Sequence, residues 1–331
     1  MNQNQLYQLG IKILKQANIE EVEVKAKRLI EFVLKQTRED FIRNSLLEVL
    51  PLQEQEYRKL LEKIIQGKPL QYITHYQEFM GIKFYVDENV LIPQPDTETL
   101  VEQAMEIIKK RKQICFNDEG KLEENSINDE RSSMRILDLC TGSGAIAVSI
   151  QKYIHDMQSK RRYKENKSKD TTFFENMCDI EIIASDISIE ALKIAKKNAA
   201  QNNVENEIQF IQSDMFSNLK DYCFDMIISN PPYIETKIIS TLSKEVQQEP
   251  NIALDGGEDG LRFYRIILEQ VEKYLKPDGY VIFEIGYDQG DKILELWMNL
   301  KRKGKCNLNI VTKKPIKDLG ENDRIMIFTN F

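Results

Sequence analysis

The stretch RILDLCTGSGAIAVSI, residues 135–150, decides the fold. Its first six residues, Arg135–Cys140, are mostly apolar and are typical of a buried parallel strand. Gly142 and Gly144 follow, and an apolar helix is expected to begin at residue 145. A glycine turn lets the backbone approach a ligand closely, and the first N–H groups of a helix are free to donate. Strand, turn and helix in this order therefore predict a cradle for a nucleotide-like ligand.

The spacing within this cradle argues against two common phosphate-binding motifs. It reads Asp138-x-x-x-Gly142-x-Gly144, which matches neither the GxGxxG fingerprint nor the GxxxxGK[ST] loop. The carboxylate of Asp138 would repel a pyrophosphate, whereas it suits a ligand with a positive amino group. We therefore expect a ligand that combines a nucleoside with an amino acid moiety.

Two further apolar stretches carry acidic residues where they end. Residues 181–186 end in Asp186, and a carboxylate at this strand tip typically binds ribose hydroxyls. Asp186 lies farther beyond the glycines than the roughly 20 residues that are usual, and a polar insertion near 158–179 accounts for the excess. After the next strand, Asp214 and Met215 can bind and cover an adenine ring, although each taken singly is also consistent with a helix cap or a core position.

The tetrapeptide Asn230-Pro231-Pro232-Tyr233, here called the NPPY turn, follows the apolar strand 224–229. Its two prolines lack N–H groups and have restricted φ, so the stretch cannot continue a strand or begin a helix normally. It offers the Asn230 side chain, backbone carbonyls and the Tyr233 ring, which suit a grip on a planar amino group. Taken alone, the tetrapeptide is equally consistent with a surface turn.

The remaining periodicity predicts three parts. Apolar residues at helical spacing indicate a small helical bundle over 1–75, and two short strands joined by residues 87–89 indicate a β-hairpin linker over 76–95. Residues 96–331 alternate strands with helices, which predicts a doubly wound α/β sheet, and Asp96 is expected to be the N-cap of its first helix. The last two strands lack a crossover helix, so we expect an antiparallel edge, and a second polar insertion lies near 112–133.

Composition narrows the class of protein. The chain has 331 residues, 41% hydrophobic and 30% charged, and its lack of an 18-residue apolar run argues against a membrane span. Five scattered cysteines without a CxxC pair and two distant histidines predict no metal site and a reducing, cytoplasmic location. The net charge of −7 argues against stable nucleic-acid binding, although the basic cluster at 160–164 leaves a local contact open.

These motifs, in this order at successive strand ends, resemble the class I S-adenosylmethionine-dependent methyltransferases. More narrowly, the chain resembles the release-factor glutamine methyltransferases of the PrmC/HemK family. The narrower resemblance covers nearly the whole chain and depends on flanking stretches that are more specific than the NPPY turn. These stretches are Gly67–Ile73, Leu91–Glu98, Glu249-Pro250, Asp255–Leu261, Phe283–Gly286 and Asn322–Arg324.

The resemblance implies a Rossmann-like seven-stranded sheet with an antiparallel edge strand, the bundle as a substrate-docking domain, and S-adenosyl-L-methionine as methyl donor. It implies methylation of the glutamine amide nitrogen in the Gly-Gly-Gln motif of bacterial class 1 peptide chain release factors. The residues implied to bind the donor are Asp138, Cys140, Thr141, Gly142, Ser143, Gly144, Asp186, Asp214, Met215 and Asn230. The residues implied in catalysis are Asn230, Pro231, Pro232 and Tyr233.

The chain departs from the family pattern at three positions. Arginine is usual where Gln94 stands, so the role of Gln94 is open. Glycine is commoner at Cys140, and an aromatic residue is common at Met215, whose thioether can still cover an adenine.

Two alternatives remain at this level. A methyltransferase acting on an amino group of adenine, cytosine or guanine would use the same NPPY grip on a flipped base. A binding module that has lost catalysis is the other, and the intact Asn230 and Tyr233 count against it.

Overall fold

The computed structural model describes residues 1–113, 133–164, 180–312 and 314–331. The two predicted polar insertions therefore lie mostly outside the described residues. One part of the second insertion is described, because helix α7 (Ala145–Lys164) continues through the basic cluster at 160–164. The prediction of a loop from residue 158 is wrong for this first part.

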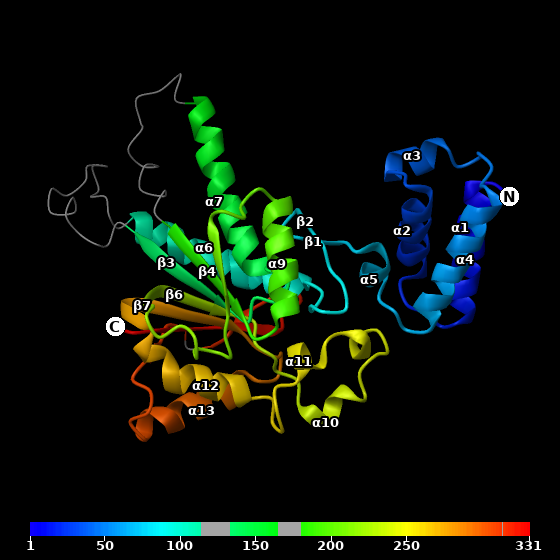
Figure 1. The fold of residues 1–331 in the computed structure, drawn as a ribbon. Coiled ribbons are helices and arrows are strands. Elements are labelled where there is room, and N and C mark those ends of the chain that lie inside the picture. Colours follow the sequence, from blue (N-terminus) through cyan, green and yellow to red (C-terminus); the bar gives the residue numbers. More distant parts are fainter. Residues whose placement is uncertain (114–132, 165–179, 313) are drawn as a thin grey trace.

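The N-terminal region forms the expected helical bundle (Figure 1). Its helices are α1 (Gln3–Gln16), α2 (Val22–Leu34), α3 (Arg38–Arg43), α4 (Pro51–Ile65) and the short α5 (Leu70–Thr74). Capping boxes at Asn2 and Thr37 satisfy the free N–H groups where α1 and α3 begin. Helix α1 approaches α4 closely at Gly10, where an added Cβ would lie 2.0 Å from the Tyr57 hydroxyl oxygen. The apolar residues that recur at helical spacing in the sequence thus form the interior of this bundle.

The linker is a hairpin, but its turn is not where we predict it. Strands β1 (Gln77–Phe79) and β2 (Ile82–Phe84) pair antiparallel across Met80 and Gly81. Both turn residues have positive φ, 52° and 71°, which is the backbone of a tight two-residue hairpin turn. The prediction of a turn at 87–89 is wrong because the left-handed pair, and not the polar run, reverses the chain.

An eight-stranded sheet has the order β5-β4-β3-β6-β7-β10-β8, with β9 pairing β10. Neighbouring strands from β5 to β7 are parallel, and β10 is antiparallel to β7, β8 and β9. This confirms the doubly wound sheet with an antiparallel edge, and the eighth strand is the two-residue β9. The strands are β3 (Met134–Leu139), β4 (Ile180–Asp186), β5 (Ile208–Gln212), β6 (Phe224–Ser229), β7 (Leu275–Glu284), β8 (Asn309–Ile310), β9 (Ile316–Lys317) and β10 (Asp323–Thr329).

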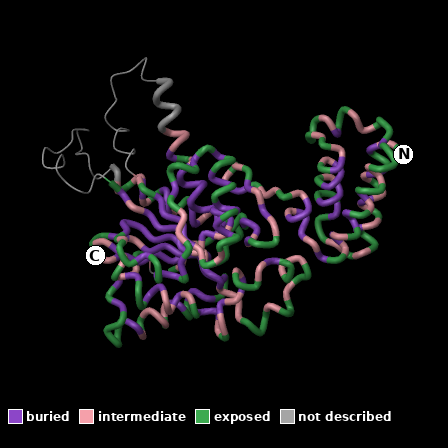
Figure 2. Tube along the Cα trace, in the orientation of Figure 1, coloured by how far each residue is buried: buried purple, intermediate pink, exposed green. Residues whose placement is uncertain are grey.

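Helices cover both faces of the sheet (Figure 1). Helices α6 (Glu98–Gln113), α7 and α9 (Ile189–Gln201) pack on one face, and α12 (Arg262–Gln270) and α13 (Gly290–Arg302) on the other. Buried residues concentrate along the central strands (Figure 2). The sequence predicts a helix over 261–275 that is stopped by residues 276–279, but α12 ends at Gln270 and residues 276–279 lie within β7. In the described residues, no helix is both long and apolar enough to cross a membrane.

The segment between β6 and α12 lies beside the bundle (Figure 1). It contains α10 (Thr236–Ile239), the 3-10 turn η5 (Val246–Gln248) and α11 (Asn251–Leu254). The ammonium of Lys25 in α2 contacts the carboxylate of Glu245 at 2.5 Å; Lys25 is buried and Glu245 is partly buried. Glu249 is buried and accepts a hydrogen bond from the backbone N–H of Ile92, at 2.9 Å. The segment that leaves the NPPY turn is therefore attached to both the bundle and the linker.

Candidate active site

The carboxyl ends of β3, β4, β5 and β6 meet at one edge of the sheet because these strands are parallel neighbours. Cross-strand hydrogen bonds join them there. The Thr141 N–H donates to the Ser185 carbonyl at 2.9 Å, and the Ser229 hydroxyl donates to the Leu139 carbonyl at 2.7 Å. The structure thereby brings three predicted features together, namely the glycine turn, Asp186 and the NPPY turn.

The turn after β3 requires left-handed backbone at three positions. Cys140, Gly142 and Gly144 have φ of 65°, 54° and 81°. An added Cβ at Gly144 would lie 3.1 Å from the Cβ of Ala195 in α9, so this glycine allows two elements to approach. An added Cβ at Gly142 would meet no atom within 4 Å, so the space above it is open to a ligand. The positive φ at Cys140 also explains why a glycine would suit that position.

The Asp138 side chain is hydrogen-bonded to this turn and to the start of α7. One carboxylate oxygen, Oδ2, accepts hydrogen bonds from the Thr141 hydroxyl at 2.5 Å and from the Ala147 N–H at 3.1 Å. The other, Oδ1, is buried and has no hydrogen-bond partner in the described part of the chain. Burial raises the pKa of Asp138 to about 7. A buried acceptor without a partner at this place fits the positive amino group that the sequence predicts.

Asp186 links the turn to the next strand end. Its Oδ2 accepts from the Gly142 N–H and its Oδ1 from the Ser188 N–H, both at 2.9 Å. Burial raises the pKa of Asp186, and these backbone hydrogen bonds oppose the rise. Each carboxylate oxygen has a second lone pair, so the side chain can still accept ribose hydroxyls.

Met215 lies beside Cys140, and the predicted residues Thr141 and Ser143 make contacts inside the protein. The sulfur of Met215 lies 4.0 Å from the sulfur of Cys140, and Met215 is buried with a φ of 48°. Asp214 beside it is exposed. The Thr141 hydroxyl is used within the protein, and the Ser143 carbonyl accepts from the Asn198 side-chain amide at 2.8 Å. Thr141 and Ser143 thus shape the turn through contacts inside the protein.

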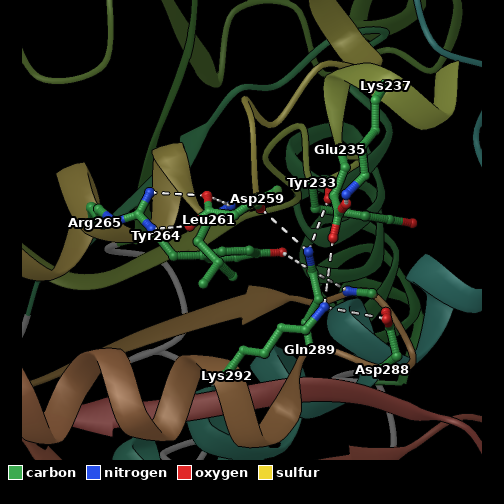
Figure 3. Close-up of polar contacts among 12 residues, drawn as sticks. Tyr233, Glu235, Lys237, Asp259, Leu261, Tyr264, Arg265, Asp288, Gln289 and Lys292 are labelled. Carbon is green, nitrogen blue, oxygen red and sulfur yellow. Dashed lines mark hydrogen bonds and ion pairs between the residues drawn. The ribbon is translucent and has the colours of Figure 1, made fainter.

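The NPPY turn is held from several distant elements. The Nδ2 of Asn230 donates to the Thr97 hydroxyl at 3.1 Å, and the Tyr233 hydroxyl donates to Oε1 of Glu284 at 3.4 Å. The Tyr233 carbonyl accepts from the Gln289 side-chain amide at 2.9 Å, a contact that Figure 3 shows. Pro231 and Pro232 are buried.

Two glycines let the following loop close over the NPPY turn. An added Cβ at Gly256 would lie 2.7 Å from the Cα of Tyr233, and one at Gly260 would lie 2.4 Å from its carbonyl oxygen. Gly260 also has a φ of 71°. The loop 255–261 therefore supports the backbone of Tyr233.

Sequence reasoning missed Thr97, Glu284 and Gln289 as site residues. Thr97 and Glu284 lie within stretches that carry the family resemblance, but no spacing connects them with Asn230, because Thr97 is 133 positions away. Glu284 is the last residue of β7, so a strand-end rule applied to the fifth strand would have found it.

Asp96 does not cap a helix, which corrects the prediction. The 3-10 turn η1 (Pro95–Thr97) begins after Gln94 and continues into α6. The Asp96 carboxylate instead lies 2.9 Å from the guanidinium of Arg324, which also pairs with the buried Asp318 at 2.9 Å. Gln94 is exposed and its side-chain amide donates to the Ile92 carbonyl at 3.0 Å. Among the described residues, no group of three or more His, Cys, Asp or Glu side chains could hold a metal ion.

Comparisons with known proteins identify two families along the chain. The family described as "Methyltransferase domain" matches residues 130–321, and the "PrmC N-terminal domain" family matches residues 5–74. A methyltransferase structure from Pyrococcus furiosus is 18% identical with a TM-score of 0.37, covering 69% of this chain and 98% of that one.

Curated relatives are more similar. The release factor glutamine methyltransferase of Clostridium acetobutylicum is 32% identical over 95% of this chain and 94% of its own length. The protein of the same name from Thermodesulfovibrio yellowstonii is 37% identical over 85% of this chain and 83% of its own. The bifunctional methyltransferase of Rickettsia typhi is 32% identical, and the chain spans about half of it, 49%. Because both families match in succession and the Clostridium relative is covered almost end to end, the chain belongs to the release factor glutamine methyltransferase family.

Proposed function

We propose that this protein transfers a methyl group from S-adenosyl-L-methionine to the side-chain amide nitrogen of the glutamine in the Gly-Gly-Gln motif of bacterial peptide chain release factors. The observation that carries the proposal is the hydrogen bond from Asn230 Nδ2 to Thr97. Since the amide nitrogen faces the protein, Asn230 Oδ1 remains as an acceptor for the substrate amide.

The proposed donor fits the edge formed by β3, β4 and β5. The open space above Gly142 would admit the amino acid part of the donor, and the unpartnered Oδ1 of Asp138 would accept from its ammonium. Asp186 would bind the ribose hydroxyls, and Met215, with Asp214 beside it, would bind the adenine. When bound, S-adenosyl-L-methionine supplies an electrophilic methyl group on a sulfonium.

The residues of the NPPY turn would act by positioning. An amide nitrogen is a weak nucleophile because its lone pair is delocalised into the carbonyl. We infer that Asn230 Oδ1 and the Pro231 carbonyl accept the two N–H hydrogens and orient the nitrogen. Pro232 keeps the turn rigid, and the Tyr233 ring would stack on the amide plane.

The helical bundle would dock the release factor. It is the part that matches the PrmC N-terminal domain, and it exposes large apolar side chains near α3 and the start of α4. These side chains are Ile42, Leu46, Leu47, Leu50 and Leu52. We expect Leu46→Glu combined with Leu52→Glu to raise KM for the release factor about 10-fold with little change in kcat. Met298→Glu is the matched control, since Met298 is also exposed but lies on α13, outside the helical bundle.

One assay tests the proposed reaction. The protein is incubated with methyl-labelled S-adenosyl-L-methionine and, separately, a release factor, its Gln→Ala variant at the Gly-Gly-Gln motif, ribosomal RNA and DNA. We expect label in the release factor alone, at the glutamine, consistent with a cytoplasmic enzyme of translation. Label in RNA or DNA and none in the release factor would replace the proposal with the nucleic-acid alternative.

A further inference from the structure

A chain of polar groups runs behind the NPPY turn. It begins at Asn230, whose Nδ2 lies 3.1 Å from the hydroxyl oxygen of Thr97. Burial raises the pKa of Glu284, and the neighbouring Thr97 hydroxyl opposes part of this rise. Glu284 is 1% exposed, its Oε1 accepts from the Tyr233 hydroxyl at 3.4 Å, and its buried Oε2 has no hydrogen-bond partner in the described part of the chain. Oε2 is therefore a buried acceptor available to the Thr97 hydroxyl.

The chemistry of these three groups gives the chain a direction. A carboxylate only accepts hydrogen bonds, whereas a hydroxyl donates one and can accept others. We infer that the single hydrogen of Thr97 turns to the unpartnered Oε2 when Glu284 is ionised. The Thr97 oxygen must then accept, and only the Nδ2 side of the Asn230 amide can donate to it. The opposite amide oxygen consequently faces the substrate side.

We propose that Thr97 and Glu284 are positioning residues that set the orientation of the Asn230 amide, so that its oxygen and not its nitrogen meets the substrate. This inference rests on the proposed function and names the groups that prepare its acceptor. Neither residue needs to touch the substrate. Loss of the Thr97 hydroxyl would let the Asn230 side-chain amide flip. In the flipped orientation, Nδ2 would face the substrate amide, and two N–H donors would then oppose each other.

The surroundings of Glu284 make this arrangement sensitive to pH. The titratable or charged groups that face it are Tyr233 after β6, Arg324 on β10, Asp96 in η1 and Tyr264 on α12. Burial raises the pKa of Glu284 to about 7, and the guanidinium of Arg324 lowers it. A protonated Glu284 can donate to Thr97 and reverse the chain. We therefore expect kcat to fall as the pH drops below about 7.

The test uses threonine variants in the full-length protein. Thr97→Val keeps the shape and removes the hydroxyl, and Thr97→Ser restores it. Thr329→Val is the matched control, because Thr329 is also buried and its hydroxyl donates to the Gly279 carbonyl at 3.0 Å. Thr329 is the last residue of β10, whereas Arg324, which faces Glu284, lies near the first. We expect Thr97→Val to lower kcat on the release factor by about 10-fold to 100-fold. We expect Kd for S-adenosyl-L-methionine to change less than about 3-fold, and Thr97→Ser to recover most of the rate.

A second readout does not depend on the substrate. The side-chain NH2 resonances of Asn230 in nitrogen-15-labelled wild-type protein should shift with pH, with a midpoint near 7, and Glu284→Gln or Thr97→Val should abolish this shift. Equal rates for Thr97→Val and wild type, equal losses in Thr97→Val and Thr97→Ser, or an Asn230 resonance that ignores Glu284 would each overturn the inference. A wild-type protein that does not methylate the release factor but shows the Asn230 shift would refute the proposed function and leave the positioning chain supported.

Discussion

The two halves of the site are held in different ways. The half proposed to bind the cofactor, at the ends of β3, β4 and β5, depends on the left-handed backbone of the turn after Asp138 and on the Asp138 and Asp186 carboxylates, which accept hydrogen bonds from backbone N–H groups. The half proposed to bind the substrate, at the ends of β6 and β7, is held by side chains from elements far apart in the chain. Asn230 bonds to Thr97 over 133 positions, and Tyr233 to Gln289 over 56.

This difference separates two kinds of dependence. A cradle made by its own backbone needs particular residues at particular φ values, so single substitutions there should act on binding. The NPPY turn is positioned by side chains from distant segments and is proposed to orient the substrate. Substitutions there should therefore lower kcat more than they weaken donor binding. Four predictions test this separation, in order of decreasing effect.

Asn230→Ala should cause the largest loss. Removing the side-chain acceptor removes a group that orients the reacting nitrogen, so we expect kcat to fall roughly 10²-fold to 10³-fold. Kd for S-adenosyl-L-methionine should change by less than about 3-fold if Asn230 acts mainly on the substrate. Single-turnover methyl transfer and calorimetry measure the two quantities. Asn309→Ala, a substitution of an exposed asparagine on β8, is the control, and near-wild-type transfer by Asn230→Ala would contradict the proposed grip.

Asp186→Ala should show the opposite pattern. It removes a carboxylate that is expected to bind ribose and leaves the Gly142 N–H without its partner, so Kd for S-adenosyl-L-methionine should rise about 10-fold to 100-fold. At saturating donor, kcat should remain within about 3-fold. Glu181→Ala is the control, because Glu181 is an exposed acidic residue on the same strand. A large loss of kcat with an unchanged Kd would mean that the two halves are not separate.

The pH dependence of donor binding should depend on Asp138. Its folded-state pKa of about 7 lies above its ordinary value of 3.8, so the folded protein without donor holds a proton there between these pH values. This group therefore contributes stability that is lost as the pH rises toward 7, by up to about 1.4 kcal/mol per pH unit. Donor binding favours the ionised form beside its ammonium, so donor affinity should increase as the pH rises toward 7.

Calorimetry between pH 5.5 and 8 measures this dependence. Asp138→Asn should flatten it, whereas Glu284→Gln, in the other half of the site, should leave it in place. If Glu284→Gln instead removed the pH dependence of donor binding, then Glu284 and not Asp138 would be the group whose ionisation controls it.

A pair of opposite substitutions in the glycine turn should have the smallest effect. Cys140→Gly removes a Cβ from a residue with a φ of 65°, so we expect no loss, or a gain of up to about 1 kcal/mol in the free energy of unfolding. Gly142→Ala adds a Cβ at a φ of 54° and should cost about 1 kcal/mol. It should also weaken donor binding, since the new methyl enters the open space above the turn. Urea unfolding gives both values, and a destabilising Cys140→Gly would show that packing on Met215 outweighs the backbone term.

Local patterns were sufficient for much of this protein. Apolar runs, glycines and strand-end acids, read in order, predict the doubly wound sheet, the bundle and the cofactor edge. These features depend on the spacing of apolar residues and on backbone conformations that few residues adopt. Both are visible within a short stretch of sequence. The positions of Asp138, Asp186 and the NPPY turn follow because parallel neighbours must end on the same edge of the sheet.

Long-range contacts decided the rest. Asp96 pairs with Arg324 because this tertiary partner outweighs the local preference for a helix cap. The hydrogen bond from Asn230 to Thr97, and the proposed continuation to Glu284, join three segments whose separation leaves no periodic trace in the sequence. Side-chain hydrogen bonds act over about 3 Å in space and at any distance along the chain, so only the folded sheet and its flanking turns bring these groups together.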